Sequence, residues 1–199
     1  IDARGFARDL RAVSPCAWQK FYGLFVKTAK PHGLTRPLLM DATVEQIDGF
    51  RFLYTLPIGE TELLVEDTRY TEDRELDFAA MKREVLGYCR TRGWIVEQVL
   101  SDEHGTLPIP FSEVRYKGPD EGVLGAGVRY GHFHPTTGYS LPYAARFAER
   151  LAQDRVKLGS ELVPVTNKRT ENQFSSQDFY RRLNNMMFRA GKPEERWRI

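Results

Sequence analysis

The sequence lacks the marks of several common protein classes. Its only two cysteines, Cys16 and Cys89, lie too far apart to form a metal or redox motif, and a reducing compartment is the simpler expectation. No run reaches the roughly 18 apolar residues that span a membrane, and no signal-peptide pattern is present. A net charge of only +2 argues against a nucleic-acid-binding protein.

A dinucleotide-binding fingerprint is also missing. Gly125 and Gly127 begin a GxGxxG spacing, but Tyr130 stands where the third glycine belongs. The chain begins with Ile rather than Met, and residues 1–5 have the character of a buried strand end followed by a loop. We therefore expect the sequence to start inside a structural motif.

The residues that are present indicate a folded, core-forming chain. Hydrophobic residues make up 41% and aromatic residues 12% of the 199 residues, enough for one domain or parts of two. In the first half, alternating apolar residues are separated by turn signals such as Asp48-Gly49, which is typical of an antiparallel meander. The predicted strands cover residues 18–27, 38–44, 50–56, 62–68 and 94–100, with a turn and another short strand within 103–110.

A helix is predicted between this sheet's fourth and fifth strands. It covers residues 76–92, Asp77 can cap its start, and Gly93 ends it. Its predicted buried stripe consists of Phe78, Met81, Val85 and Cys89. Two loops are predicted further along the chain, one rich in Gly and charge over residues 117–127 and an irregular segment over 156–171.

A last helix is predicted to start at Ser175, with Asp178 as its capping-box partner, and to end at Gly191. Its predicted apolar face consists of Phe179, Leu183, Met186, Met187 and Ala190. Three arginines, Arg181, Arg182 and Arg189, accompany that face. A basic, apolar helix of this kind either lies on an anionic bilayer or packs on the core of its domain, and the two roles can coexist.

The stretch from Gly131 to Pro142 passes from a polar loop into a helix over residues 141–152. Ser140 is a good N-cap residue, and a proline in the first helical turn does no harm. The helix start presents backbone N–H groups and a positive dipole, and Thr136, Thr137 and Gly138 allow close approach. The pattern indicates either a site for an anion or electron-rich ring, or an ordinary capped loop.

Glu66 and Asp67 form the most informative pair of carboxyl groups. Because side chains alternate along a strand, the two groups are expected on opposite faces, each beside apolar neighbours. A carboxyl group against an apolar wall has a raised pKa, as a general acid at neutral pH requires. The alternative, which the residues alone favour, is a sheet-edge carboxylate that faces water or pairs with Arg51 or Arg69.

Several segments together resemble one family. FHPTTGYSLP (133–142) resembles the flavin-contacting loop of the bacterial lycopene cyclases. Four further segments resemble the same family in the same order: PHGLTRPLLMDATV (31–44), GFRFLYTLP (49–57), LLVEDTRY (63–70) and FYRRLNNMMFRAG (179–191). Together these segments extend over most of the chain, so the resemblance is specific in a way that HPTTG alone would not be.

The resemblance implies an α/β two-domain flavoprotein fold, with an antiparallel substrate sheet inserted into a nucleotide-binding domain. Residues 1–12 would end a strand and loop of the FAD-binding domain, and 13–114 would form the substrate-binding domain. Residues 115–155 would return to the FAD-binding domain, and 156–199 would form a C-terminal helical region. The family's dinucleotide fingerprint lies upstream and its helical end continues downstream, so an internal fragment is expected.

The resemblance also implies a reaction, the non-redox cyclisation of the linear ends of lycopene to the β-rings of β-carotene. The family's acidic motif matches Glu66 as the acid-base residue, with Asp67 as a supporting group. Reduced FAD is the implied cofactor and NAD(P)H its electron source. Substrate contacts are expected at Asp41, Phe52 and Tyr54, and Phe21, Phe25 and Phe50 are further aromatic candidates for the wall or for plain core packing.

Cofactor contacts are implied at two places, the start of the chain and the loop. They are Asp2, Ala3, Arg4, Gly5, His134, Pro135, Thr136, Thr137, Gly138, Tyr139 and Ser140. Asp2 would take a ribose hydroxyl or orient the loop, although an ordinary turn role is as good a reading. His132 and His134 have strand spacing for a metal, but no third ligand is apparent, so no metal is expected.

The implied partners are lycopene and carotenoid intermediates, with peripheral membrane contact on the cytoplasmic side of a bacterium and no nucleic acid. Two rival functions stay open. One is a related FAD-dependent hydroxylase or reductase, which flavin reoxidation coupled to substrate turnover would favour. The other is a non-enzymatic carotenoid- or lipid-binding module, which isolation with bound pigment but no flavin would favour.

Overall fold

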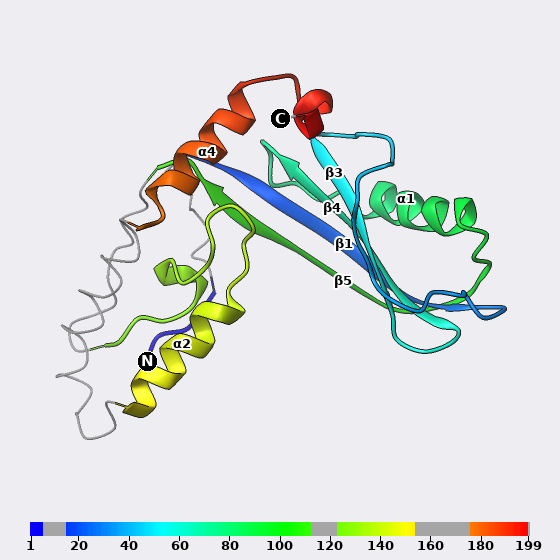
Figure 1. The fold of residues 1–199 in the computed structure, drawn as a ribbon, viewed down its shortest axis with the longest axis horizontal. Helices are drawn as coiled ribbons and strands as arrows, with labels where there is room; N and C mark the ends of the chain where they lie inside the picture. Colours follow the sequence, from blue (N-terminus) through cyan, green and yellow to red (C-terminus); the bar gives the residue numbers. More distant parts are fainter. Residues whose placement is uncertain (6–14, 113–122, 154–175, 199) are drawn as a thin grey trace. The chain divides into compact units, whose positions relative to one another are not determined.

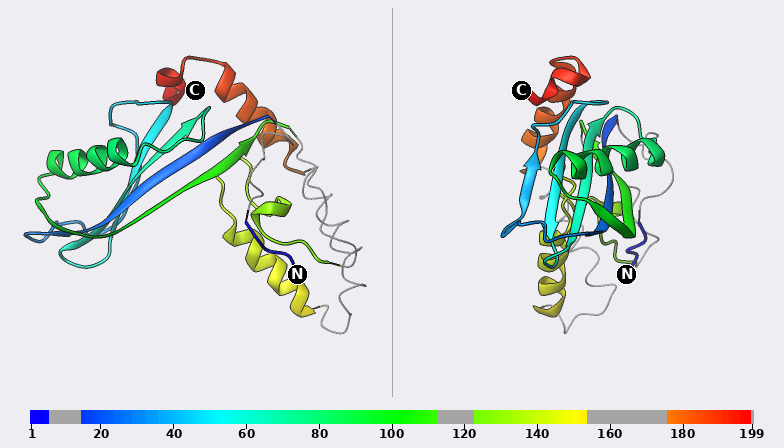
Figure 2. Two further views of the ribbon diagram at one scale, coloured as in Figure 1. Left: turned by 180° about the vertical axis from the view of Figure 1, so that it is seen from behind. Right: turned by 90° about the vertical axis from the view of Figure 1, so that its right-hand side faces the viewer.

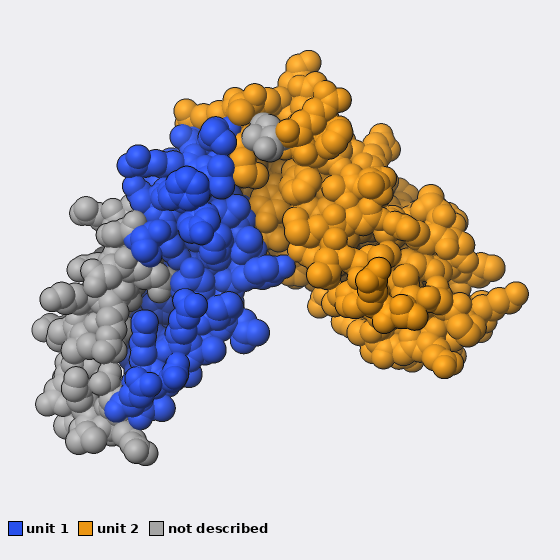
Figure 3. All heavy atoms as spheres, viewed as in Figure 1, with its two compact units in different colours: residues 1–16, 108–186 blue, residues 17–107, 187–199 orange. Residues whose placement is uncertain are grey.

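The computed structural model describes residues 1–5, 15–112, 123–153 and 176–198, which form a mixed α/β structure (Figure 1). The chain divides into two compact units, coloured separately in Figure 3. Unit 1 comprises residues 1–16 and 108–186, and unit 2 comprises residues 17–107 and 187–199. Each unit is described below by itself.

Unit 2 is built on a five-stranded antiparallel sheet, which confirms the predicted sheet. Its strands are β1 (Cys16–Thr28), β2 (Leu38–Asp41), β3 (Phe50–Pro57), β4 (Glu62–Thr71) and β5 (Val96–Pro110). Their spatial order is β2-β3-β4-β1-β5, so β2, β3 and β4 form the expected meander and β1 pairs with the other edge of β4. The long strand β1 therefore lies between β4 and β5.

Two predicted strand boundaries are wrong. Residues 94–100 and 103–110 were expected as separate strands, but β5 continues through both. Gly105 lies in the segment that was expected to contain a turn, but a Cβ there would lie 2.7 Å from the Phe21 ring, so this glycine allows close packing inside a strand. β2 ends at Asp41 rather than at residue 44, because its pairing with β3 shifts register and Met40 adopts a positive φ of 55°.

Helix α1 (Phe78–Thr91) packs on one face of the sheet, as the two views in Figure 2 show. Its start is capped as predicted, with the Ala80 N–H donating to Asp77 Oδ1 over 2.9 Å, and it ends before Gly93 at a φ of 74°. Tyr88 joins the buried stripe in place of Phe78, which is 46% exposed in the first turn. The core that the helix shares with the sheet comprises Tyr22, Leu24, Val26, Leu53, Leu63, Val65, Met81, Val85, Tyr88, Cys89 and Trp94.

Unit 1 contains the short 3₁₀ helix η2 (Val128–Tyr130), helix α2 (Leu141–Gln153) and the start of α4 (Asp178–Arg189). The predicted helix after Ser140 is thus confirmed, but none of the α2 side chains is buried in the described part of the chain. A second 3₁₀ helix, η3 (Pro193–Arg198), belongs to unit 2 and contacts β3. The predicted loop 156–171 and most of 117–127 lie outside the described residues.

The predicted apolar face of α4 does not coincide with the buried face of the helix. The residues that the structure buries on this helix are Arg181, Asn184 and Phe188, which follow one helical face at spacings of three and four. Phe179 and Met186 are instead 68% and 51% exposed. The buried polar groups bind backbone and side-chain partners, so hydrogen bonding rather than hydrophobicity selects this face. The predicted start at Ser175 lies outside the described residues, and the Asp178 carboxylate pairs with Arg181 and Arg182.

Candidate functional site

Strand β4 presents its two acidic residues to opposite faces of the sheet, as the alternation predicts. Asp67 is paired with Leu53 of β3, whose side chain belongs to the core under α1. Glu66 is paired with Tyr54 of β3 and with Gly23 of β1, on the other face. Two neighbouring carboxyl groups are thereby placed in separate environments.

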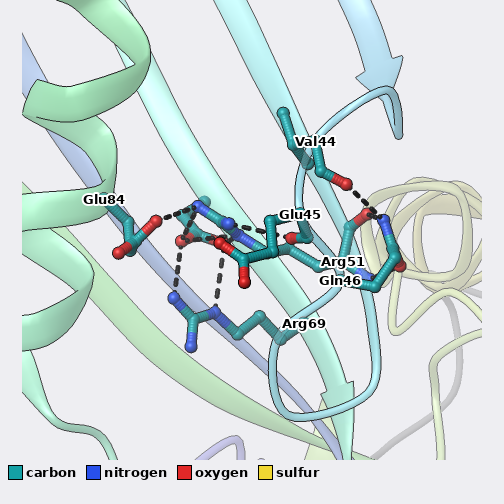
Figure 4. A network of polar contacts seen from close by, with 7 residues as sticks. Val44, Glu45, Gln46, Arg51, Arg69 and Glu84 are labelled. Carbon is teal, nitrogen blue, oxygen red and sulfur yellow. Dashed lines mark hydrogen bonds and ion pairs between the residues drawn. The ribbon is translucent and has the colours of Figure 1, made fainter. Parts of the chain in front are cut away.

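Asp67 is fully buried and belongs to an ion-pair network, in which Figure 4 labels Arg51, Arg69 and Glu84. Arg51 Nε donates to both of its carboxylate oxygens over 3.1 Å, and Arg69 Nη2 donates over 2.8 Å. Glu84 of α1 pairs with Arg51 over 3.1 Å and so connects the helix to the network. Of the two roles foreseen for this carboxylate, the structure shows the ion pair with arginines, which serves the packing of the sheet against α1.

The face that carries Glu66 is rich in aromatic side chains. Phe52 lies 5.3 Å from Phe50 and 5.2 Å from Tyr54 between ring centroids, and Tyr70 of β4 completes the cluster. On β1, the half-buried Phe21 and Phe25 occupy the same face on either side of Gly23. The structure therefore gathers Glu66 with Phe52 and Tyr54, two of the three residues predicted to contact a substrate.

The Glu66 carboxyl is half-buried and accepts a hydrogen bond of 2.8 Å from the Thr68 hydroxyl. Burial raises its pKa to about 7; the Thr68 hydrogen bond opposes this rise and the carboxyl of Glu103 adds to it. At neutral pH a substantial fraction of this group is consequently protonated. A protonated carboxyl on an apolar, aromatic face is able to act as a general acid.

Glu103 of β5 is a site residue that the sequence reasoning missed. A Cβ at Gly23 would lie 3.1 Å from Glu103 Cγ, so this side chain crosses the bare backbone of β1 toward Glu66. The available signal was a glycine inside an aromatic strand, which marks a close approach of other groups. It was overlooked because residues 103–110 were interpreted as a turn and a short strand.

Asp41, the third residue predicted to contact a substrate, lies on the face of the sheet that α1 covers. Its carboxylate accepts hydrogen bonds from Tyr88 over 2.6 Å, from Thr43 and from Arg92. Burial raises the pKa of Asp41, but these hydrogen bonds outweigh it and lower the pKa to about 2. The structure thus separates Asp41 from Glu66, Phe52 and Tyr54, and its predicted substrate contact stays a prediction.

In unit 1, the loop of residues 134–140 folds around the imidazole of His134. The backbone N–H groups of Thr136 and Thr137 donate to His134 Nδ1 over 3.3 Å, and burial lowers the pKa of this histidine. Backbone bonds between His134 and both Gly138 and Tyr139 close the loop, with Gly138 at a φ of 71°. The N–H groups of Thr136 and Thr137 are therefore used inside the loop, while Tyr139 is 57% exposed.

Two buried amide side chains from the C-terminal part of unit 1 hold this loop, and sequence reasoning missed both. Gln177 Nε2 donates to the Phe133 carbonyl over 3.1 Å and to the Tyr143 hydroxyl over 3.0 Å. Asn184 Nδ2 donates over 3.0 Å to the carbonyls of Pro135 and Pro110. The only sequence signal was an asparagine within an apolar helix pattern, which is too weak to identify a partner more than forty residues away.

The start of the chain lies against the segment before the loop. Asp2 bridges Gly125 in parallel, and its carboxylate accepts hydrogen bonds from Arg4 and from the Tyr130 hydroxyl, which hold the pKa of Asp2 below its usual range. A Cβ at Gly125 would lie 2.7 Å from the Tyr130 ring, so this glycine makes room for the tyrosine that stands where a dinucleotide fingerprint has its third glycine. Ala3, Arg4 and Gly5 are exposed.

The two histidines of the loop region have separate aromatic partners. His132 packs on Phe147 and His134 on Tyr180, with ring centroids 5.3 Å and 4.5 Å apart. Within the described ranges, no three His, Cys, Asp or Glu side chains gather as ligands of a metal ion would. None of the described helices combines the length and apolar character needed to cross a membrane.

Comparisons with known proteins agree on one family. A model described as "Lycopene cyclase protein" matches residues 1–199. Lycopene beta-cyclase from Pseudescherichia vulneris is 42% identical over 202 residues and that from Pantoea ananas 38% over 200, each match covering the whole chain and 52% of the relative. A chloroplastic neoxanthin synthase from Solanum tuberosum is 26% identical over 178 residues, covering 80% of this chain and 35% of the relative.

The chain therefore spans about half the length of the curated bacterial relatives that it matches. The family match extends over both structural units, including the Glu66 face in unit 2 and the loop of residues 134–140 in unit 1. A match of this extent decides the family, and the chain belongs to the lycopene cyclases.

Proposed function

We propose that this chain forms the acid-bearing sheet and the flavin loop of a lycopene β-cyclase. The observation that carries the proposal is Glu66, a carboxyl with a pKa raised to about 7 on an aromatic face of the sheet. Relatives named lycopene beta-cyclase, at 38% to 42% identity over the whole chain, support the same assignment. The proposed reaction is the non-redox cyclisation of the linear ends of lycopene to the rings of β-carotene.

In this proposal Glu66 gives its proton to the terminal double bond of the linear polyene. A tertiary cation results, a second double bond attacks it to form the new C–C bond of the ring, and loss of a proton then leaves the ring alkene. Water would quench the cation, so the reaction needs a lining that excludes it. The faces of Phe52, Tyr54 and their aromatic neighbours would also stabilise the positive charge.

Asp67 would act by position rather than by contact with substrate. Its ion pairs with Arg51 and Arg69 fix the segment of β4 that carries Glu66. Phe52 and Tyr54 are proposed as substrate contacts because they share the face of Glu66. Asp41 lies on the opposite face, where its hydrogen bond with Tyr88 connects the edge strand β2 to α1. It would therefore affect substrate binding only indirectly, by holding β2 in place.

Reduced FAD is the proposed cofactor, with NAD(P)H as its electron source. An exposed tyrosine, threonine hydroxyls and a positive-φ glycine at the start of α2 suit the edge of a planar ring with polar atoms. When bound, reduced FAD would supply an electron-rich ring that stabilises positive charge on the substrate. The proposed contacts are His134, Pro135, Thr136, Thr137, Gly138, Tyr139 and Ser140, with Asp2, Ala3, Arg4 and Gly5 from the start of the chain.

We also propose peripheral contact with the cytoplasmic side of a bacterial membrane, from which a long hydrocarbon substrate must be taken up. The exposed Phe179 and Met186 of α4 lie close in sequence to Arg182, whose side chain is 82% exposed. Apolar and basic groups on one helix suit an anionic bilayer surface. In the full-length protein, residues 1–12 and 115–155 would belong to the FAD-binding domain and 13–114 to the substrate domain, with a C-terminal helical region over 156–199.

The test is to express the full-length protein in cells that accumulate lycopene and to identify the pigment formed. β-Carotene is the expected product, and bound flavin should accompany the purified protein. Unchanged lycopene together with tightly bound pigment and no flavin would instead favour a carotenoid-binding module. Hydroxylated or reduced pigment, formed as the flavin is reoxidised, would favour the related flavoprotein hydroxylase or reductase.

A further inference from the structure

The middle strand of the sheet has a gap in its row of side chains beside Glu66. β1 lies between β4 and β5, and its residue opposite Glu66 is Gly23. On the same face of β1 the neighbours of this glycine are Phe21 and Phe25, both large. Among Phe21, Gly23 and Phe25, only Gly23 leaves room for a side chain from β5 to cross toward β4.

Glu103 uses this gap. A Cβ at Gly23 would meet Glu103 Cγ at 3.1 Å and Glu103 Oε1 at 3.4 Å. The same Cβ would meet Leu64 Cδ1 of β4 at 3.1 Å, so side chains from both flanking strands converge above the glycine. The charge of Glu103 and hydrogen bonding with its carboxyl group both raise the pKa of Glu66. A hydrogen bond between two carboxyl groups forms only when one of them carries a proton.

We propose that Glu66 and Glu103 form one carboxyl pair that shares a single proton across Gly23, and that Glu103 is the residue that keeps this proton available for the substrate. The inference rests on the proposed cyclisation and adds a second acidic group to it. Glu103 is a positioning residue, because it acts on the substrate only through Glu66.

The charges around the pair favour this arrangement. Two carboxylates in contact cannot both ionise without strong repulsion, so Glu66 keeps its proton to a higher pH than it would without Glu103 beside it. Burial, Glu103 and Asp67 all raise the pKa of Glu66, whereas the hydroxyl of Thr68 lowers it. β3 contributes the phenol of Tyr54 opposite Glu66, and β1 contributes only the backbone of Gly23.

The proton count of the reaction is conserved. At rest the pair holds one proton and one negative charge, and after Glu66 has given its proton to the alkene the pair holds two negative charges. The cyclised cation then loses one proton, which returns to the pair and restores the resting state. The mutual repulsion of the two carboxylates makes the pair a better base at the moment when this proton must be taken up.

The test measures the pH dependence of kcat/KM for lycopene cyclisation by the full-length enzyme with reduced FAD. Glu103→Gln removes the like charge, so the alkaline limb of the profile should move to lower pH by about one unit or more. Activity at pH 8, relative to the acidic plateau of the same variant, should fall roughly tenfold further than in wild type. Glu103→Asp keeps the charge on a shorter side chain and should lie between the two.

Asp102→Asn is the matched control. It removes an acidic charge from the adjacent residue of β5, whose side chain points to the other face beside His104, and its profile should match wild type. An infrared band of a protonated carboxyl at pH 7 gives a readout independent of turnover. Wild type should have this band, Glu66→Gln should lose it, and Glu103→Gln should weaken it, because burial still raises the pKa of Glu66 when the like charge is gone.

The outcomes separate this proposal from the proposed function. A Glu103→Gln profile that superimposes on wild type, or a uniform loss at every pH without a shift, overturns the shared proton while leaving Glu66 as the acid. Full cyclisation by Glu66→Gln overturns the role of Glu66 and the pair with it. A shifted limb for Glu103→Gln with an unshifted Asp102→Asn supports the pair.

Discussion

On the face of the sheet that α1 covers, Asp67 is fully buried and binds two arginines, one of which also binds Glu84. On the opposite face, the adjacent residue Glu66 meets an aromatic cluster and a second carboxyl group. The two residues have the same acidic chemistry and follow each other in the chain. The sheet nevertheless places Asp67 beside positively charged arginines and Glu66 beside another acidic group.

This difference separates a structural carboxylate, Asp67, from the carboxyl group that we propose as the acid, Glu66. Opposite charges stabilise the ionised form and hold it in one geometry, which is useful for packing a helix on a sheet. A like charge and desolvation stabilise the protonated form, which is useful for delivering a proton. This arrangement lowers the stability of the folded protein. Substitution of Glu66 should therefore reduce activity, and substitution of Asp67 should reduce stability.

The largest expected effect is the loss of cyclisation in Glu66→Gln. The amide keeps the size of the side chain but has no acidic proton, and general acid catalysis is typically worth about 10²–10⁴-fold. An alkene is a weak base, so the loss should reach the upper end of that range. The measurement is the amount of β-carotene formed by the full-length variant in lycopene-accumulating cells, with flavin content as the control for folding.

Substantial β-carotene from a Glu66→Gln protein with normal flavin content would remove this residue from the mechanism. The acid would then have to be sought elsewhere, first at Glu103, whose side chain reaches the same position above Gly23. Such a result would also mean that Glu66 and Asp67 do not differ in catalytic role, because neither of them would donate the proton.

The second effect is the loss of stability in Asp67→Asn. This change removes the negative charge from a buried site and leaves Arg51 and Arg69 without their shared partner, which costs about 3–5 kcal/mol. Urea unfolding of the full-length protein measures the cost. The control is Glu97→Gln, which breaks an exposed pair with Lys27 and should cost less than about 1 kcal/mol. Equal midpoints for the two variants would contradict the structural role of Asp67.

The third effect is a change in how stability depends on pH. The pKa of Glu66 is raised from 4.5 to about 7 in the folded protein, so the folded state binds more protons than the unfolded state between those values. The stabilisation is fully present below pH 4.5 and is lost as the pH rises through 7. Glu66→Gln should remove this contribution to the pH dependence. Between pH 5 and pH 8, wild type should therefore lose on the order of 2 kcal/mol more unfolding free energy than the variant does.

Urea midpoints at pH 5 and pH 8 test this expectation, with Asp102→Asn again as the matched control. A wild-type protein whose stability does not fall between these two values would show that the Glu66 carboxyl titrates at its ordinary pKa. The contrast with Asp67 would then rest on geometry alone, because burial beside aromatic rings would not have altered the acidity of Glu66.

The sequence predicted the strands and α1 well because their signals are local. Alternation along β1, β3 and β4 and the cap at Asp77 depend on neighbours only a few residues away. The same alternation correctly separated Glu66 from Asp67. The role of Glu66 was not available from alternation alone and depended on the resemblance to a known family.

The remaining site depends on contacts between distant segments. Glu103 reaches Glu66 only because Gly23 lies between them, and the pattern around Gly105 was interpreted as a turn. On α4, helical periodicity selected the hydrophobic side, whereas the structure buries Arg181 and Asn184. Buried polar side chains follow their hydrogen-bond partners, which hydrophobic periodicity does not reveal.

The smallest expected effect extends the contrast to unit 1, where Asn184 is a buried polar residue with satisfied donors. Asn184→Ala would leave the carbonyls of Pro110 and Pro135 without this donor, at a cost of about 1–2 kcal/mol. Pro135 belongs to the proposed flavin loop, so part of this cost should appear as weaker FAD binding, roughly fivefold to thirtyfold if it is fully coupled. Asn185→Ala is the matched control, because it shortens the neighbouring amide on the same helix without removing a bond to the loop.

Fluorescence titration of full-length apoprotein with FAD measures the FAD affinity of both variants, and urea unfolding shows how much of the loss comes from lower overall stability. Equal FAD affinities for the two variants would mean that the amide stabilises unit 1 without organising the loop, and the loop would then owe its shape to the hydrogen bonds around His134.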